Sequence, residues 1–160
     1  MEHRVKVTGI AHDANVAKIT LRRVPDKPGV AGSLFEPLSD IGISVDTIVQ
    51  NTSLDHITDL SFTVARDDLE KAAEIVGTVA KSLGAGELST DQTLSKVSIV
   101  GAGMLNAPGY AARMFQALVK ANINIDMITT SEIRITCIVR ESQVEDAVRA
   151  LHRAFQLEEP

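Results

Sequence analysis

Aromatic residues are scarce in this chain of 160 residues: they make up 3%, with four phenylalanines, one tyrosine and no tryptophan. The 16 basic residues are outnumbered by 21 acidic ones, which leaves a formal net charge of −5, and no basic run stands out. Surfaces that bind nucleic acids depend on basic patches and, for single strands, on stacking aromatic side chains. The sequence therefore predicts no nucleic-acid partner.

Long apolar runs and cysteines are also lacking. The most apolar stretch, residues 97–114, is interrupted by Asn106 and Pro108, and no charged-then-apolar leader is recognisable, so we expect a cytoplasmic protein without a membrane partner. The single cysteine, Cys137, alternates with apolar residues as on the inner face of a strand, which predicts a core residue rather than a reactive thiol. The four histidines share no ligand-like spacing, so no metal site is predicted.

An internal repeat organises the chain. Residues 26–48 (DKPGVAGSLFEPLSDIGISVDTI) align without gaps on residues 106–128 (NAPGYAARMFQALVKANINIDMI). The identical pairs include Pro28 and Pro108, Gly29 and Gly109, Ala31 and Ala111, Phe35 and Phe115, Leu38 and Leu118, Ile43 and Ile123, and Asp46 and Asp126. Two copies of one structural unit are therefore expected.

Each copy has the periodicity of a β-α-β-β-α unit. Strands are predicted at 17–22, 43–48 and 59–65 in the first copy, and at 96–100, 123–128 and 133–139 in the second. The first helix of each copy should end at Gly42 or Asn122, two residue types that tolerate a left-handed backbone. The second helix should open on a capping box, Asp67 with Glu70 or Ser142 with Glu145.

The fourth strand of each unit sets the domain boundaries. Residues 86–91 supply it in the first copy, whereas the second copy runs out of chain, and the N-terminal strand at 4–11 has no repeat of its own. We expect that strand to complete the second unit. The prediction is an α+β protein with two ferredoxin-like βαββαβ domains, antiparallel sheets with helices on one face: an inserted domain at 15–92 and a discontinuous one formed by 1–14 and 93–160.

A glycine-containing turn follows the strand at 96–100 and suggests a dinucleotide site. The fingerprint needs G-x-G-x-x-G within a parallel β-α-β unit, but here Asn106 stands in place of the third glycine, after Gly101 and Gly103. The first copy lacks these glycines and is otherwise unchanged. A small nucleotide-binding enzyme is therefore the weakest of the interpretations we consider.

A family resemblance extends over nearly all of the chain. It is carried by the paired turns DKPG and APGY, by the segments ISVDTIVQN and INIDMITTSEIRI, and by KVSIVGAGM. The chain resembles the tandem ACT domains of aspartokinases, especially the separate regulatory beta subunit. That resemblance implies a regulatory, non-catalytic chain that lacks the kinase domain and needs no cofactor. The implied partners are a second copy of the chain and a catalytic alpha subunit, as an α2β2 assembly.

The resemblance also implies a threonine site that mediates feedback inhibition of the aspartate-family amino-acid pathway, with lysine as a candidate second effector. The residues carried over are Asp26, Lys27, Pro28, Gly29, Val30, Ala31 and Gln50 from the first unit, and Asn124 and Ile125 from the second unit of a partner chain. Either Gln50 or a backbone group near Asn124 could meet the threonine hydroxyl. A second cleft, built by Asn106, Pro108, Gly109 and Tyr110 with Ser44 and Val45, is expected to be empty, because Tyr110 adds bulk and Asn106 replaces Asp26.

Alternatives stay open at this stage. The two Pro-Gly pairs are also explained by turn chemistry alone. A sensor of the same fold with a branched-chain ligand, such as the regulatory subunit of acetolactate synthase, is the leading rival. Pro37 should kink or shorten the first helix. The loop at 51–59 is either a contact to the catalytic subunit or merely solvated.

Overall fold

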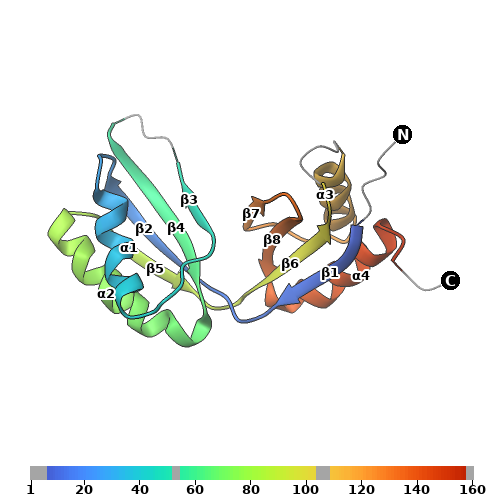
Figure 1. Ribbon diagram of the computed structural model, residues 1–160, viewed down its shortest axis with the longest axis horizontal. Helices are drawn as coiled ribbons and strands as arrows, with labels where there is room; N and C mark the ends of the chain where they lie inside the picture. Colours follow the sequence, from blue (N-terminus) through green and yellow to red (C-terminus); the bar gives the residue numbers. More distant parts are fainter. Residues whose placement is uncertain (1–6, 52–54, 104–108, 158–160) are drawn as a thin grey trace. The chain divides into compact units, whose positions relative to one another are not determined.

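The computed structural model describes residues 7–51, 55–103 and 109–157, which form two compact units (Figure 1). The first unit comprises residues 15–92; the second combines the residues before 15 with those after 92. Each unit has its own four-stranded sheet and its own cluster of buried side chains. Each unit therefore has the sheet and the core of a domain of its own.

The first unit has the order β2-α1-β3-β4-α2-β5. Its elements are β2 (Ala17–Pro25), α1 (Val30–Asp40), β3 (Ile48–Gln50), β4 (Ile57–Val64), a 3-10 turn (Arg66–Asp68), α2 (Leu69–Leu83) and β5 (Leu88–Asp91). The sheet order is β3-β4-β2-β5, and every neighbouring pair is antiparallel. This is the ferredoxin-like arrangement.

The second unit repeats this order from a different starting strand. Its elements are β6 (Leu94–Gly101), α3 (Tyr110–Lys120), β7 (Met127–Thr130), β8 (Arg134–Arg140), a 3-10 turn (Glu141–Gln143) and α4 (Val144–Ala154). The N-terminal strand β1 (Val7–Asp13) pairs with β6 and takes the outer place in the order β1-β6-β8-β7. The predicted α+β, ferredoxin-like class is confirmed in both units.

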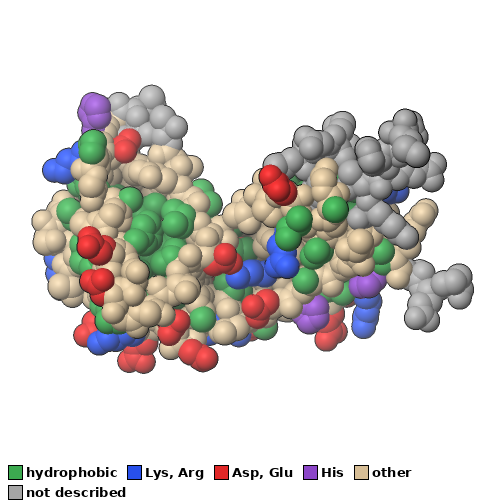
Figure 2. Space-filling view, in the orientation of Figure 1, with side chains coloured by type: hydrophobic (Ala, Val, Ile, Leu, Met, Phe, Trp, Pro, Cys, Tyr) green, Lys and Arg blue, Asp and Glu red, His purple; other side chains and the backbone are tan. Residues whose placement is uncertain are grey.

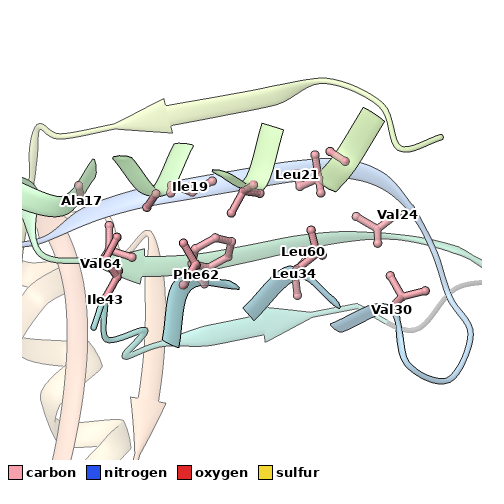
Figure 3. Packing of buried hydrophobic residues seen from close by; sticks show 14 residues of the cluster. Ala17, Ile19, Leu21, Val24, Val30, Leu34, Ile43, Leu60, Phe62 and Val64 are labelled. Atoms are coloured by element: carbon pink, nitrogen blue, oxygen red, sulfur yellow. The ribbon is translucent and has the colours of Figure 1, made fainter. Parts of the chain in front are cut away.

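The core of each unit lies between its sheet and its helix pair. In the first unit, inward-facing side chains of β2 and β4 meet Val30 and Leu34 of α1, and the Phe62 ring packs edge-on against Phe35 with centroids 5.1 Å apart (Figure 3). Figure 3 labels the strand contributors Ala17, Ile19, Leu21, Val24, Leu60, Phe62 and Val64. The alternation that predicted the strands at 17–22 and 59–65 is thus the alternation of this buried face.

The sheet geometry removes the dinucleotide interpretation. β6 is antiparallel to both of its neighbours, β1 and β8, and β7 is separated from it by β8. The fingerprint needs two adjacent parallel strands joined by the helix. Gly101 ends β6 and Gly103 has a φ of 72°, but the strand they follow is not part of a Rossmann unit.

The helix ends at Gly42 and Asn122 are confirmed. Gly42 has a φ of 79° and Asn122 a φ of 59°, both in the left-handed region. The backbone N–H groups of Ile43 and Ile123 then bond back to the carbonyls of Leu38 and Leu118 at 2.9 Å. Glycine and asparagine therefore close the same turn in the two copies.

Two sequence predictions need correction. The segments 43–48 and 123–128 are mostly not strand, because only their ends join the ladders of β3 and β7. The capping boxes are also wrong: Asp67 and Ser142 lie inside 3-10 turns, and α2 and α4 begin after them without a side-chain cap bond. In the first of these turns the Asp68 N–H already bonds to the Ala65 carbonyl at 3.0 Å.

Pro37 does not shorten its helix. α1 runs unbroken over 11 residues, the same length as α3, which has Ala117 at this position. Proline removes the bond to the Ser33 carbonyl, but Ser33 is exposed, so water can satisfy that oxygen. The expected early end is therefore wrong.

Cys137 is buried in the core of the second unit, as predicted. Its sulfur lies 3.9 Å from the Met114 sulfur, and burial raises the pKa of the thiol to about 12.

Because only the thiolate reacts readily, we expect Cys137 to resist a thiol-labelling reagent at pH 8 in the folded protein and to react in urea. Since its folded pKa is raised, the contribution of this thiol to stability should be lost as pH rises toward 12. Fast labelling without urea would contradict this assignment.

Candidate functional site

A hollow of about 380 Å³ opens in the first unit where β2 turns into α1. Its lining residues are Pro25, Asp26, Lys27, Pro28, Gly29, Val30, Ala31, Gln50 and Leu60. All seven first-unit residues that the resemblance implied for the threonine site lie in this lining. The Pro-Gly turn is therefore the wall of a concave site as well as a connection. Figure 2 shows hydrophobic side chains gathered in the middle of the near face of the first unit.

The turn is held in place by a bulge in β2. The β2–β4 pairing shifts register between Leu21 and Val24, where Arg23 adopts a left-handed φ of 56°. Asp59 of β4 fixes this conformation: its carboxylate accepts the Arg23 N–H at 3.0 Å and lies 3.6 Å from the Arg22 guanidinium. Bulges of this kind bend a strand and redirect the chain beyond it.

The ladder resumes beyond the bulge and leads into the hollow. Val24 and Pro25 pair with Thr58 and Ile57, and the Asp26 N–H donates to the His56 carbonyl at 2.7 Å. The backbone before the Pro-Gly turn is thus anchored to β4. The exposed side chains of Asp26 and Lys27 come directly after this anchor.

Gly29 is the N-cap residue that immediately precedes helix α1, at the wall of the hollow. Its φ of 90° is in the region that side chains disfavour, and no side chain caps the helix. The first helical bond runs from the Ser33 N–H to the Gly29 carbonyl at 3.1 Å, so the N–H groups of Ala31 and Gly32 have no acceptor within the helix. Such a terminus favours a carboxylate, through its free donors and its dipole.

Gln50 reaches the site from the neighbouring edge strand. It is the last residue of β3, exposed, and paired across the ladder with Leu60. Its amide can donate and accept a hydrogen bond at the rim. The site thus offers N–H donors, a carboxylate, an ammonium and an amide around one concavity, a set suited to a small zwitterion with a polar side chain.

The sequence reasoning missed two lining residues, Pro25 and Leu60. Leu60 has only 2% of its surface exposed and belongs to the core, so its type alone carries no functional signal. Both residues could have been predicted if the register of the strands had been known. Leu60 lies opposite Gln50, and Pro25 lies opposite Ile57 at the end of the β2–β4 ladder.

The residues expected from the second unit lie between α3 and β7. Asn124 is exposed, whereas Ile125 is half-buried and packs against the second core. Their contribution to a site in a partner chain stays a prediction.

Only part of the predicted second cleft is described. Asn106 and Pro108 lie outside the described residues. Gly109 is the N-cap residue of α3 and has a φ of 102°, as Gly29 is the N-cap residue of α1. The Tyr110 ring stacks on Phe155, with centroids 6.2 Å apart and planes 8° from parallel. In the first unit, Ser44 is exposed and Val45 packs against the core.

The described residues include neither a candidate metal site nor a membrane-spanning helix. Among residues 7–51, 55–103 and 109–157, no group of three or more His, Cys, Asp or Glu side chains is placed to hold a metal ion. None of the helices described there has the length and apolar character to cross a bilayer.

Comparison with known proteins agrees with this geometry. Models of the ACT domain match residues 17–80 and residues 97–155, one in each unit. A solved chain from aspartokinase alpha and beta subunits is 46% identical, with a TM-score of 0.87 over 94% of this chain and 99% of that chain. The ligand-free regulatory subunit of aspartate kinase from Thermus thermophilus is 40% identical, with a TM-score of 0.89 over 93% and 98% of the two chains.

This chain belongs to the aspartokinase family of regulatory chains with two ACT domains. Aspartate kinase of Pseudomonas fluorescens is 49% identical over 154 residues, and aspartokinase of Mycolicibacterium smegmatis is 40% identical over 153. The match to the Pseudomonas protein covers 96% of this chain but 37% of that protein. This chain therefore spans little more than a third of the length of such a relative. The resemblance read from the repeat is confirmed.

Proposed function

We propose that this chain senses threonine in the hollow of the first unit and transmits its binding to an aspartokinase catalytic chain, which it inhibits by feedback. The observation that carries the proposal is the convergence of Asp26, Gly29, Ala31 and Gln50 on one concavity of about 380 Å³. The family membership says which enzyme such a sensor would regulate.

Each polar group of threonine has a counterpart in the proposed site. The carboxylate is received by the N–H groups at the start of α1, which Gly29 leaves open because it has no side chain. The ammonium is received by Asp26. The hydroxyl is received by Gln50 or by backbone near Asn124 of a partner chain. Lysine is the second candidate effector.

The regulatory output requires partners. We propose a homodimer in which Asn124 and Ile125 of one chain complete the site of the other, and an α2β2 assembly with the catalytic subunit in the cytoplasm. One of the similar solved structures is of aspartokinase alpha and beta subunits together. Coupling between effector and catalytic sites is commonly about 1–3 kcal/mol and requires threonine to bind the inhibited assembly better than the active one.

Gln50→Ala tests the polar contact. Losing one hydrogen bond of about 1 kcal/mol should weaken threonine affinity by about fivefold and shift the inhibition curve of the reconstituted kinase by the same factor. Thr130→Ala is the matched control, because Thr130 ends β7 as Gln50 ends β3. Equal threonine affinity in the wild type and the Gln50 variant would remove Gln50 from the site.

A further inference from the structure

A second hollow, of about 480 Å³, lies between helices α3 and α4 of the second unit. We call it the helix groove; its lining residues are Arg113, Gln116, Ala117, Lys120, Ala121, Ala150, Arg153 and Ala154. Three of the eight carry a positive charge, none carries a negative charge, and four are alanines. In a chain with a net charge of −5, this is a local reversal of sign.

The three cations have no carboxylate partner in the part of the chain that the structure describes. Arg113 is nevertheless held in position, because its guanidinium carbon lies 5.3 Å from the centroid of the Phe155 ring, which stacks on Tyr110. A cation–π contact leaves the N–H groups at the guanidinium edge available to a ligand. At least one charge of the groove is therefore preorganised.

The first unit serves as an internal control, since it has the same fold. Equivalent positions follow from the gapless alignment of α1 with α3 and from the 3-10 turns that precede α2 and α4. On α3, the positions of Arg113, Gln116, Ala117, Lys120 and Ala121 are equivalent to those of Ser33, Glu36, Pro37, Asp40 and Ile41 on α1. On α4, the positions of Ala150, Arg153 and Ala154 are equivalent to those of Ile75, Thr78 and Val79 on α2.

The comparison shows that the fold does not require the chemistry of the groove. The first unit has two acids and no cation at these positions, and Ile41, Ile75 and Val79 where the second unit has alanine. Ile41 is 50% exposed, but Ile75 and Val79 are partly buried and pack against the first core, so alanine at their two positions forfeits apolar burial, about 0.8 kcal/mol for each buried methylene. At two positions of the helix groove, Ala150 and Ala154, the second unit therefore has less apolar packing than the first unit, and it has positive charge beside them.

We propose that the helix groove binds a small molecule that carries two or more anionic groups, phosphate or carboxylate. Two guanidinium groups and an ammonium supply charge-assisted donors, and the Gln116 amide adds a neutral one. The volume lies within the range of small-ligand sites, about 300–1,000 Å³. A concavity between two helices favours such a ligand over the flat acidic surface of a protein.

Calorimetric titration of the whole chain with inorganic pyrophosphate and with citrate, in low-salt buffer, tests this proposal. The wild type should bind at least one of them, and added salt should weaken the binding. The ligand that binds better identifies phosphate or carboxylate as the preferred group. A variant with the first unit's residues, Arg113→Ser, Lys120→Asp and Arg153→Thr, should bind about tenfold or more weakly.

Lys71→Asp is the matched control: Lys71 is exposed on α2, outside the groove, and the change in charge equals that of Lys120→Asp. Far-UV circular dichroism of each variant reports whether it is folded, and threonine titration reports the proposed threonine site of the first unit. Failure of the anion-site proposal can therefore be distinguished from failure of the threonine-site proposal. The proposal is overturned if the wild type binds neither anion or if the triple variant binds the anion as tightly as the wild type does. It is also overturned if Lys71→Asp weakens anion binding as much as the triple variant does. Loss of catalytic-chain association in the triple variant, without anion binding, would assign the groove to an acidic protein surface instead.

Discussion

Gly29→Asp should abolish measurable threonine binding and leave the reconstituted kinase insensitive to threonine. The new carboxylate would stand at the start of α1, where the effector carboxylate is expected, and would repel it while occupying its donors. A side chain at a φ of 90° adds about 1–2 kcal/mol of backbone strain. Threonine titration by calorimetry, followed by inhibition assays with the catalytic subunit, measures both effects.

Two control variants separate charge, strain and location. Gly29→Ala carries the strain alone, because a Cβ built on Gly29 meets no atom within 4 Å, and it should retain more threonine affinity than the aspartate variant. Gly109→Asp puts the same charge on an equally left-handed residue at the start of α3 and should leave threonine binding near the wild-type level. If Gly29→Asp bound threonine normally, the hollow in the first unit would not be the effector site.

Phe62→Ala should destabilise the first unit by about 3–5 kcal/mol and leave the second unit folded. The Phe62 ring is fully buried and is among the largest side chains of that core. The second core is a separate cluster, which includes Cys137. Hydrogen exchange followed by mass spectrometry should show lost protection in peptides of residues 15–92, while Cys137 labelling in urea keeps its wild-type midpoint.

Phe35→Ala is the milder control, because Phe35 is half-buried at the rim of the same ring pair. It should lower the urea resistance of the first unit by less than Phe62→Ala. If both units lost protection together in the Phe62 variant, the two cores would form one cooperative structure and the treatment of the units as separate folding modules would be wrong.

Much of the fold was predictable because the sequence contains two copies of one unit, whose patterns can be compared with each other. A strand alternation such as that of 17–22 is weak evidence alone, but the same pattern in both copies identified the ferredoxin-like class. The stops at Gly42 and Asn122 were predictable because few residue types adopt the left-handed backbone that each helix end requires.

The errors arose where burial and hydrogen bonding diverge. Ile43 is buried and Val45 packs on the core, so 43–48 alternates like a strand, yet ladder pairing starts only at Ile48. The Asp46 N–H donates to the Thr63 carbonyl and the Thr63 N–H donates to the Thr47 carbonyl, both at 3.0 Å, which extends the contact to β4 without forming a regular strand. The capping boxes failed because spacing alone cannot show that a 3-10 turn precedes a helix.

Most residues that line the hollow were predicted from the sequence, but its shape was not, and their role in binding stays a prediction. The Pro-Gly turn and Gln50 are 21 residues apart in sequence and meet because β3 pairs with β4 and β4 pairs with β2. Only the resemblance to the aspartokinases pointed to both. The bulge at Arg23 that aims the turn is a tertiary feature, stabilised by Asp59 from another strand, and has no local signature in the sequence.

Calorimetric titration of the purified wild-type chain with threonine, lysine, isoleucine and valine, at a concentration where its oligomeric state has been measured, tests the central claim most directly. We predict that threonine binds most tightly and that Gly29→Asp removes this binding. Binding of isoleucine or valine without threonine would contradict the account and favour a sensor of branched-chain amino acids.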